Sequence, residues 1–185
     1  MTGMYSLRKF NPEKDLQNLF RVYSDYSEQY KLFSVMSLNC YESFINQFNR
    51  QLDRYKEFVI IEVEEVFAGF IAAYDFKNID GHIKAMIYIE PRFRYSVIGL
   101  AGLEFVSILF QYYNIRKVYT EVYSYNEDSI KYHVNAGFVE ECRLKEYKFF
   151  DGEYWDVIYF SITRSEFYKK NGDIVSRFLQ NRNRV

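Results

Sequence analysis

Residues 126–140 read NEDSIKYHVNAGFVE and contain a short helix with clear signals at both ends. Asn126 is a residue type that caps helices, because its side chain can accept a hydrogen bond from a backbone N–H of the first turn. The helix closes on Asn-Ala-Gly, and a strand is predicted to begin at Phe138. This helix is short, its first turn is polar, and it ends abruptly before a strand, so its role depends on the elements around it.

Strands and a long helix are predicted around this segment. Residues 98–113 have the strongest helical pattern in the chain, and residues 117–123 form a strand before the short helix. Two further strands, 138–150 and 154–162, follow it. Asp151-Gly152 joins them, and this dipeptide between two such runs is a strong signal for a β-hairpin.

The first half of the chain supplies the remaining elements. The predicted elements are a strand at 5–10, a helix that starts at Pro12 and a second helix at 40–52. A hairpin follows, whose first strand is 58–63 and whose second strand ends at residue 76, and the next strand is 82–90. This order predicts a single α/β domain with a mixed sheet. Residues after Arg164 have a helical pattern, so we expect the domain to span 1–167 and a helical tail to span 168–185.

Composition excludes several classes of protein. The 185 residues suffice for one domain, and 24 basic residues against 25 acidic ones give no surface for nucleic acid. No apolar run approaches about 18 residues, so we expect no membrane span. The N-terminus lacks a secretory pattern, which favours a cytoplasmic location. Cys40 and Cys142 form no zinc motif, and we expect no metal site and two buried or half-buried thiols.

A candidate anion site lies in IEPRFRYSVIGLAG, residues 89–102, which connects a predicted strand to the long helix. The first turn of a helix leaves backbone N–H groups unpaired and carries partial positive charge, so it can hold a phosphate. Arg92, Arg94 and Ser96 would add to such a site. An ordinary helix start with surface arginines has the same pattern, and the residues alone leave both readings open.

The order of elements, this junction, the short helix and the final hairpin together resemble the GNAT superfamily of acyl-CoA-dependent N-acetyltransferases. The resemblance covers about residues 5–167 and is strongest for the branch of ribosomal-protein-alanine and spermidine acetyltransferases. In that branch an Asn opens the short helix, a Ser follows three places on, and Gly-Phe closes it. The matching residues here are Asn126, Ser129, Gly137 and Phe138, followed in the hairpin by Asp151, Gly152, Tyr154 and Asp156.

The resemblance implies a binding site for acetyl-CoA. Relatives have a largely antiparallel sheet whose two central parallel strands, here 85–90 and 117–123, splay apart around the pantetheine arm, with helices on both sides. Their pyrophosphate loop corresponds to Arg94, Tyr95, Ser96, Val97, Ile98 and Gly99. Arg94 and Gly99 match the pattern, whereas Val97 stands where a Gly is expected and is predicted to weaken CoA binding. Ile89, Asn126 and Ser129 complete the implied cofactor site.

The implied reaction is attack of an amine on a thioester. Many relatives place a Tyr at the eighth position of the short helix to protonate the leaving thiolate, and here that position is His133. The alternative is that His133 is a surface residue, while its neighbour Tyr132 or water supplies the proton. A backbone N–H near Ile89 would stabilise the oxyanion. Glu62, Asp75 and Glu90 are candidate bases by strand position only, and none is assigned.

We therefore expect an acetyl-CoA-dependent N-acetyltransferase that acts on a primary amine of a small molecule or a protein N-terminus. Neither Cys lies in the cofactor motif, which favours direct transfer in a ternary complex over a covalent intermediate. One alternative is a GNAT-fold interaction module that binds CoA weakly. Another is an acyltransferase that acts on an amino sugar. Relatives often dimerise through the final hairpin, so a homodimer is a further expectation.

Overall fold

The structure of the protein, a computed structural model, describes residues 5–25, 40–94 and 99–182. Its elements are, in order, β1 (Tyr5–Lys9), α1 (Pro12–Ser24), α3 (Tyr41–Leu52), β2 (Tyr55–Val63), β3 (Val66–Lys77), β4 (His82–Ile89), the 3₁₀ helix η1 (Pro91–Phe93), α4 (Gly99–Tyr112), β5 (Lys117–Tyr123), α5 (Glu127–Asn135), β6 (Val139–Phe150), β7 (Glu153–Thr163) and α6 (Arg164–Arg182). Each helix and strand predicted from the sequence is present, with its ends within about three residues of the predicted ones.

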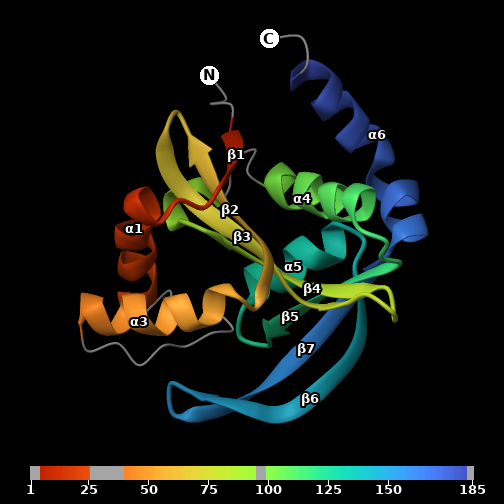
Figure 1. Ribbon diagram of the computed structural model, residues 1–185. Helices are drawn as coiled ribbons and strands as arrows, with labels where there is room; N and C mark the ends of the chain where they lie inside the picture. The colour runs from red at the N-terminus through yellow and green to blue at the C-terminus, as the bar shows by residue number, and fades with distance from the viewer. Residues whose placement is uncertain (1–4, 26–39, 95–98, 183–185) are drawn as a thin grey trace.

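The strands form one seven-stranded sheet in the order β1-β2-β3-β4-β5-β7-β6. Neighbouring strands are antiparallel except β4 and β5, which are parallel. A parallel pair needs a crossover connection, and the segment that contains η1 and α4 supplies it (Figure 1). The predicted fold class, an α/β domain with a mixed, largely antiparallel sheet and flanking helices, is confirmed.

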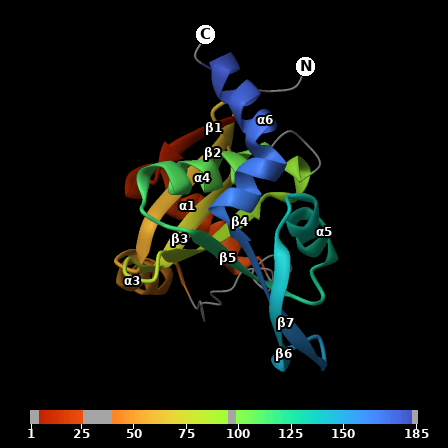
Figure 2. The same cartoon turned by 90° about the vertical axis from the view of Figure 1, so that its right-hand side faces the viewer.

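Helices cover both faces of the sheet (Figures 1 and 2). On one face, α1 and α3 pack through Leu19, Phe44 and Phe48 against a core that includes Phe70 of β3. On the other face, the buried residues of α4 and α6 pack against the alternate residues of the same strands. Many of the aromatic side chains lie in these two cores, which agrees with a packing role for the Tyr-rich and Phe-rich composition.

Two tight turns fix the register of the outer hairpins. Asp151 and Gly152 have φ values of 52° and 83°, the positive values that the turn between β6 and β7 requires. Glu64 and Glu65 adopt the same region, at 50° and 63°, between β2 and β3. The hairpin of β6 and β7 extends beyond the rest of the sheet, and β6 is its edge strand (Figure 1).

The predicted boundary at residue 167 falls inside α6, which runs without interruption from Arg164 to Arg182. Beyond that boundary Val175 is buried, and buried Asn171 donates a hydrogen bond from Nδ2 to the Ala136 carbonyl over 2.9 Å. This part of the predicted tail therefore packs on the domain. No helix among the described residues is long and apolar enough to cross a membrane.

The expectation about the exposure of the two cysteines is wrong. Cys40 and Cys142 are both exposed rather than buried or half-buried. Cys40 is the N-cap of α3, a position at the end of a surface helix, and Cys142 lies on the edge strand β6.

Candidate active site

Helix α5 begins and ends as the sequence predicts. The Asn126 side chain caps it, with Oδ1 accepting a hydrogen bond from the Ser129 backbone N–H over 3.3 Å. Glu127 and Asp128 place negative charge in the first turn, where the helix dipole favours it. Gly137, with a φ of 89°, ends the helix and lets β6 start at Val139.

The loop between β5 and α5 is tied to the final hairpin. The Asp156 N–H donates to Ser124 Oγ over 3.0 Å, and the Ser124 N–H donates to the Asp156 carbonyl over 2.9 Å. The ring of Tyr125 packs against Phe150 and Trp155. Since Tyr125 directly precedes the cap of α5, these contacts set where the short helix starts.

His133 lies inside the protein rather than on its surface. The residue is 4% exposed, and its ring stacks on Phe160 and meets Phe138 edge to face. Its Nδ1 lies 2.7 Å from the Ser129 carbonyl oxygen, which can only accept, so Nδ1 carries the proton. Burial lowers the pKa of His133 to about 4, so at neutral pH the ring is uncharged and Nε2 is an acceptor.

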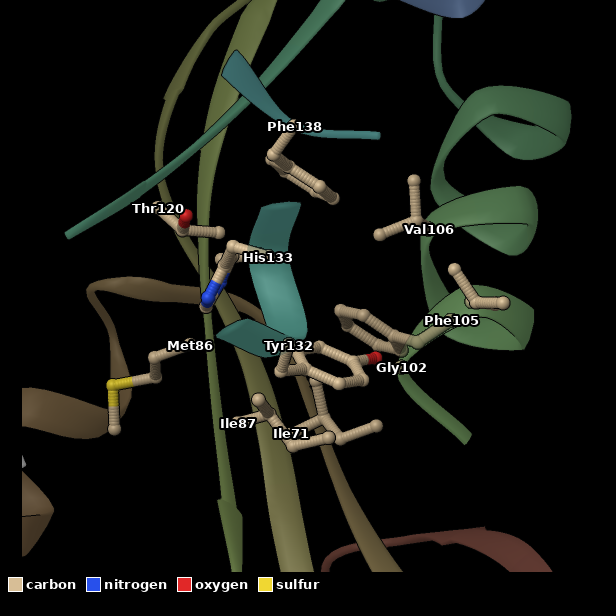
Figure 3. Close-up of a pocket in the computed structure, with 12 residues that line it drawn as sticks. Ile71, Met86, Ile87, Gly102, Phe105, Val106, Thr120, Tyr132, His133 and Phe138 are labelled. Atoms are coloured by element: carbon tan, nitrogen blue, oxygen red, sulfur yellow. The ribbon is translucent and has the colours of Figure 1, made fainter. Parts of the chain in front are cut away.

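Tyr132 faces α4 instead. Its hydroxyl donates to the Gly99 carbonyl over 2.9 Å, at the start of that helix, and Figure 3 shows the phenol beside Gly102. A Cβ added to Gly102 would lie 2.2 Å from this hydroxyl, so no larger residue fits there while the contact stands. Burial raises the pKa of Tyr132. The phenol is therefore placed to hold α5 against α4.

The parallel pair of β4 and β5 separates after a short contact. The strands are in register from His82 opposite Lys117 to Lys84 opposite Tyr119, and no further pairing follows. On its other side, β4 pairs with β3 as far as Ile89 opposite Gly69. Beyond Lys84, the edge of β4 that faces β5 therefore has no strand partner, as predicted for splayed central strands.

A cavity of about 380 Å³ occupies this opening. Its lining comes from β4, from β5, from α5 and from the start of α4, and consists of Ala85, Met86, Ile87, Tyr88, Ile89, Arg94, Gly99, Thr120, Glu121, Val122, Asn126, Asp128, Ser129, Lys131, Tyr132, His133 and Asn135. A smaller space of about 30 Å³ lies between the sheet and α4 and shares Thr120, Tyr132 and His133 with it (Figure 3).

The cavity brings together most of the predicted site residues. Ile89, Arg94, Gly99, Asn126 and Ser129 line it with His133 and Tyr132, and Arg94 Nε donates to the Ile89 carbonyl over 3.1 Å. The other predicted members of the phosphate loop, Tyr95, Ser96, Val97 and Ile98, lie outside the described residues. The predicted effect of Val97 on CoA binding therefore stays a prediction.

Sequence reasoning missed three residues of β5 that line the cavity, Thr120, Glu121 and Val122, of which the first two are polar. Thr120 and Glu121 are consecutive on the strand and so point to opposite faces of the sheet. Glu121 accepts hydrogen bonds from Lys84 Nζ over 2.7 Å and from the Tyr74 hydroxyl over 3.0 Å. Their position five and six places before Asn126, on a strand predicted to splay, is the signal that could have identified them.

The three carboxylates weighed as bases are all held in ion pairs. Glu90 is paired with Arg21 and Arg92, and Glu62 is paired with Arg8. Asp75 is paired with Lys77 over 2.8 Å, which lowers the pKa of its carboxyl. None of the three lines the cavity. In the described part of the chain, no cluster of His, Cys, Asp and Glu residues could hold a metal ion.

Comparison with models of known protein families gives no match. Comparison with individual proteins finds the SPbeta prophage-derived uncharacterized N-acetyltransferase YokL of Bacillus subtilis (strain 168), which is 31% identical to this chain over 120 residues. The match spans 62% of this chain and 66% of that protein, just under two thirds of its length.

Solved structures share the whole fold. The crystal structure of spermidine N-acetyltransferase from Vibrio cholerae in complex with CoA and spermine has a TM-score of 0.78 at 20% identity, over 88% of this chain and 97% of that one. A crystal structure described as a probable acetyltransferase has a TM-score of 0.73 at 18% identity, over 88% and 94% of the two chains. The chain therefore shares the fold of these acetyltransferase structures, and over 120 residues its sequence is similar to that of an N-acetyltransferase.

Proposed function

We propose that the protein is an acetyl-CoA-dependent N-acetyltransferase that transfers an acetyl group to a primary amine of a small molecule or of a protein N-terminus. The observation that carries this proposal is the open edge of β4 inside an otherwise continuous sheet. The thioester of acetyl-CoA supplies the activated acetyl group.

The described residues fit such a co-substrate. A strand edge without a partner presents backbone donors and acceptors in a row, and an extended ligand with amide groups can bind it like an added strand. The pantetheine arm is a ligand of this kind. The cavity of about 380 Å³ lies within the usual range for small-molecule sites. Arg94 and the first turn of α4 follow the end of β4 that is not paired with β5, and there they favour the phosphates.

The tautomer of His133 bears on its proposed role. We expected it to protonate the leaving thiolate, yet its proton is on Nδ1 and directed to Ser129. In this state Nε2 can accept a hydrogen bond and cannot donate one. We therefore propose His133 as an acceptor at the reaction centre, and Tyr132 as a positioning residue that holds α5 on α4.

Direct transfer is favoured over a covalent intermediate. An acyl-cysteine intermediate would need a thiol at the cavity, and neither Cys40 nor Cys142 lines it. Two carboxylates line it: Glu121 is paired with Lys84, and Asp128 would favour a cationic acceptor. The Vibrio cholerae enzyme is described in complex with spermine, so polyamines are the first acceptors to test. The cytoplasmic location and the homodimer are part of the proposal.

The test is a panel of amines with saturating acetyl-CoA, in which released CoA is detected with a thiol reagent. The panel includes spermidine, spermine, simple monoamines and a peptide with a free N-terminus. The form of each active amine in which every primary amine is acetylated serves as the matched control and should give no release. If no amine causes release and calorimetry detects no binding of CoA, the interaction module becomes the better description.

A further inference from the structure

Thr120 is a buried side chain with an unused hydroxyl. The residue is 6% exposed, and its Oγ1 has no hydrogen-bond partner among the described residues. Leaving a buried hydroxyl unpaired is unfavourable, and most such groups in folded proteins have a partner. An apolar residue of the same shape would avoid this penalty. The hydroxyl is therefore available to a partner that binds from outside the chain.

The position of Thr120 shows where that partner would lie. The last pair of residues in register between β4 and β5 is Lys84 with Tyr119, so Thr120 is the first residue of β5 after the strands part. It lines both the large cavity and the smaller space beside it. The hydroxyl and methyl groups share Cβ, so one rotation about the Cα–Cβ bond can turn the hydroxyl toward the cavity.

His133 stands next to Thr120 on the same wall and complements it chemically (Figure 3). With its proton held by the Ser129 carbonyl, its Nε2 can only accept. The stacking on Phe160 and the contact with Phe138 keep the ring in this orientation. Most of the other residues around the smaller space are apolar. This end of the cavity thus offers one donor and one acceptor in an apolar setting.

A sulfur atom suits this pair. A thioester sulfur or a thiolate can accept from a hydroxyl, and a thiol can in addition donate weakly to an imidazole nitrogen. The direction of the ligand agrees with this. If the phosphates of CoA lie by Arg94 and the start of α4, beyond the unpaired end of β4, the sulfur at the opposite end of the molecule points toward the place where the strands meet.

We propose that Thr120 donates a hydrogen bond to the sulfur of CoA. This inference rests on the proposed function, because it requires the same co-substrate. No bond to Thr120 forms or breaks. The contact strengthens as negative charge develops on sulfur, since hydrogen bonds to a charged acceptor are the stronger ones. Thr120 would thus be a catalytic residue that favours departure of the thiolate, while His133 accepts from the free thiol.

The first test uses the protein without ligand. Thr120→Val keeps the shape of the side chain and removes the unpaired hydroxyl, so the melting temperature should rise by about 2–4 °C. Thr120→Ser keeps the hydroxyl and is the matched control, without this gain. A fall in the melting temperature of Thr120→Val would show that the hydroxyl has a structural partner, and the proposal would be wrong.

The second test compares binding of CoA and of desulfo-CoA, in which the thiol is replaced by hydrogen, by calorimetry at pH 8.5, where much of the thiol is ionised. Thr120→Val should weaken CoA binding about 3- to 10-fold and leave desulfo-CoA unchanged, and Thr120→Ser should behave as the natural protein. Equal effects on both ligands, or no effect on either, would overturn the role of Thr120 alone. If the natural protein binds neither ligand, the proposed function itself fails.

Discussion

The two edges of strand β4 differ sharply. Toward β3, its residues pair from His82 to Ile89 with one irregularity, and the sheet is closed. Toward β5, pairing stops at Lys84, and the remainder of the edge faces a cavity. The same backbone is therefore a structural element on one side and a binding element on the other.

The side chains next to each edge explain the difference. At the closed edge, Gly69 has no Cβ, which lets the backbone of β3 approach Tyr88 and Ile89. At the open edge, α5 lines the cavity between the strands through His133 and Tyr132. An open strand edge normally invites association with other chains. Here it lies within the sheet, so a small extended ligand is the natural occupant.

The closed edge should be the most sensitive to added volume. In Gly69→Ala, the new Cβ would lie 2.1 Å from the Tyr88 carbonyl oxygen, and because that atom belongs to the backbone the strands must move apart. We expect a loss of about 3 kcal/mol or more in the free energy of unfolding, measured by urea denaturation.

Gly172→Ala in α6 is the matched control, because nothing lies within 4 Å of its new Cβ. It should stabilise the protein by up to about 1 kcal/mol, through helix propensity. Similar effects of the two substitutions would mean that the strands do not approach closely at Gly69.

The burial of His133 beside the open edge of β4 should make the free energy of unfolding depend on pH. The pKa of His133 is about 4 in the folded protein and 6.5 in the reference state. Between these values the unfolded chain binds a proton that the folded one does not, so stability falls as pH drops from about 6.5 to about 4. Above pH 6.5 the contribution is constant. The difference corresponds to about 3 kcal/mol in the free energy of unfolding.

His133→Phe isolates this effect, because it keeps a ring against Phe160 and removes the titrating group. Other groups titrate in the same range, so the quantity to compare is the difference between the two denaturation profiles. The natural protein should lose about 3 kcal/mol more than the variant as the pH is lowered. Parallel profiles would show that the imidazole is exposed to water, which would contradict the burial of His133 in the structure.

The smallest expected effect concerns the hydrogen bond that holds α5 against α4 beside the open edge of β4. Tyr132→Phe removes the hydrogen bond to the Gly99 carbonyl and should lower stability by about 1 kcal/mol, or the melting temperature by about 2–4 °C. Tyr112→Phe, at an exposed position, should change neither stability nor turnover. A large loss of turnover in Tyr132→Phe without loss of stability would instead give Tyr132 the proton-donating role.

The strands, turns and helix ends could be predicted well from the sequence. Asp151-Gly152 identified the final hairpin, and Asn126 and Gly137 identified both ends of α5, because turns and caps depend on local geometry. Alternating apolar residues identified the strands. The resemblance to acetyltransferases then supplied the parallel central strands and their splay, which local patterns do not determine.

The open edge could be predicted only in part. His133 and Tyr132 are neighbours on one helix, so the sequence could not show that one stacks on Phe160 while the other bonds Gly99. The tautomer of His133 depends on a contact that only the fold reveals. Thr120 and Glu121 carry no motif of their own, and their relevance follows from where β5 leaves β4.

Hydrogen exchange with and without acetyl-CoA tests the central claim most directly. Ligand bound along the open edge should slow exchange of amides in residues 85–89 of β4 and in α5. Amides in the outer part of the hairpin of β6 and β7, residues 144–155, should exchange at the same rate in both states. Protection confined to other segments, or none at acetyl-CoA concentrations that saturate binding in calorimetry, would contradict the assignment of this edge as the acetyl-CoA site.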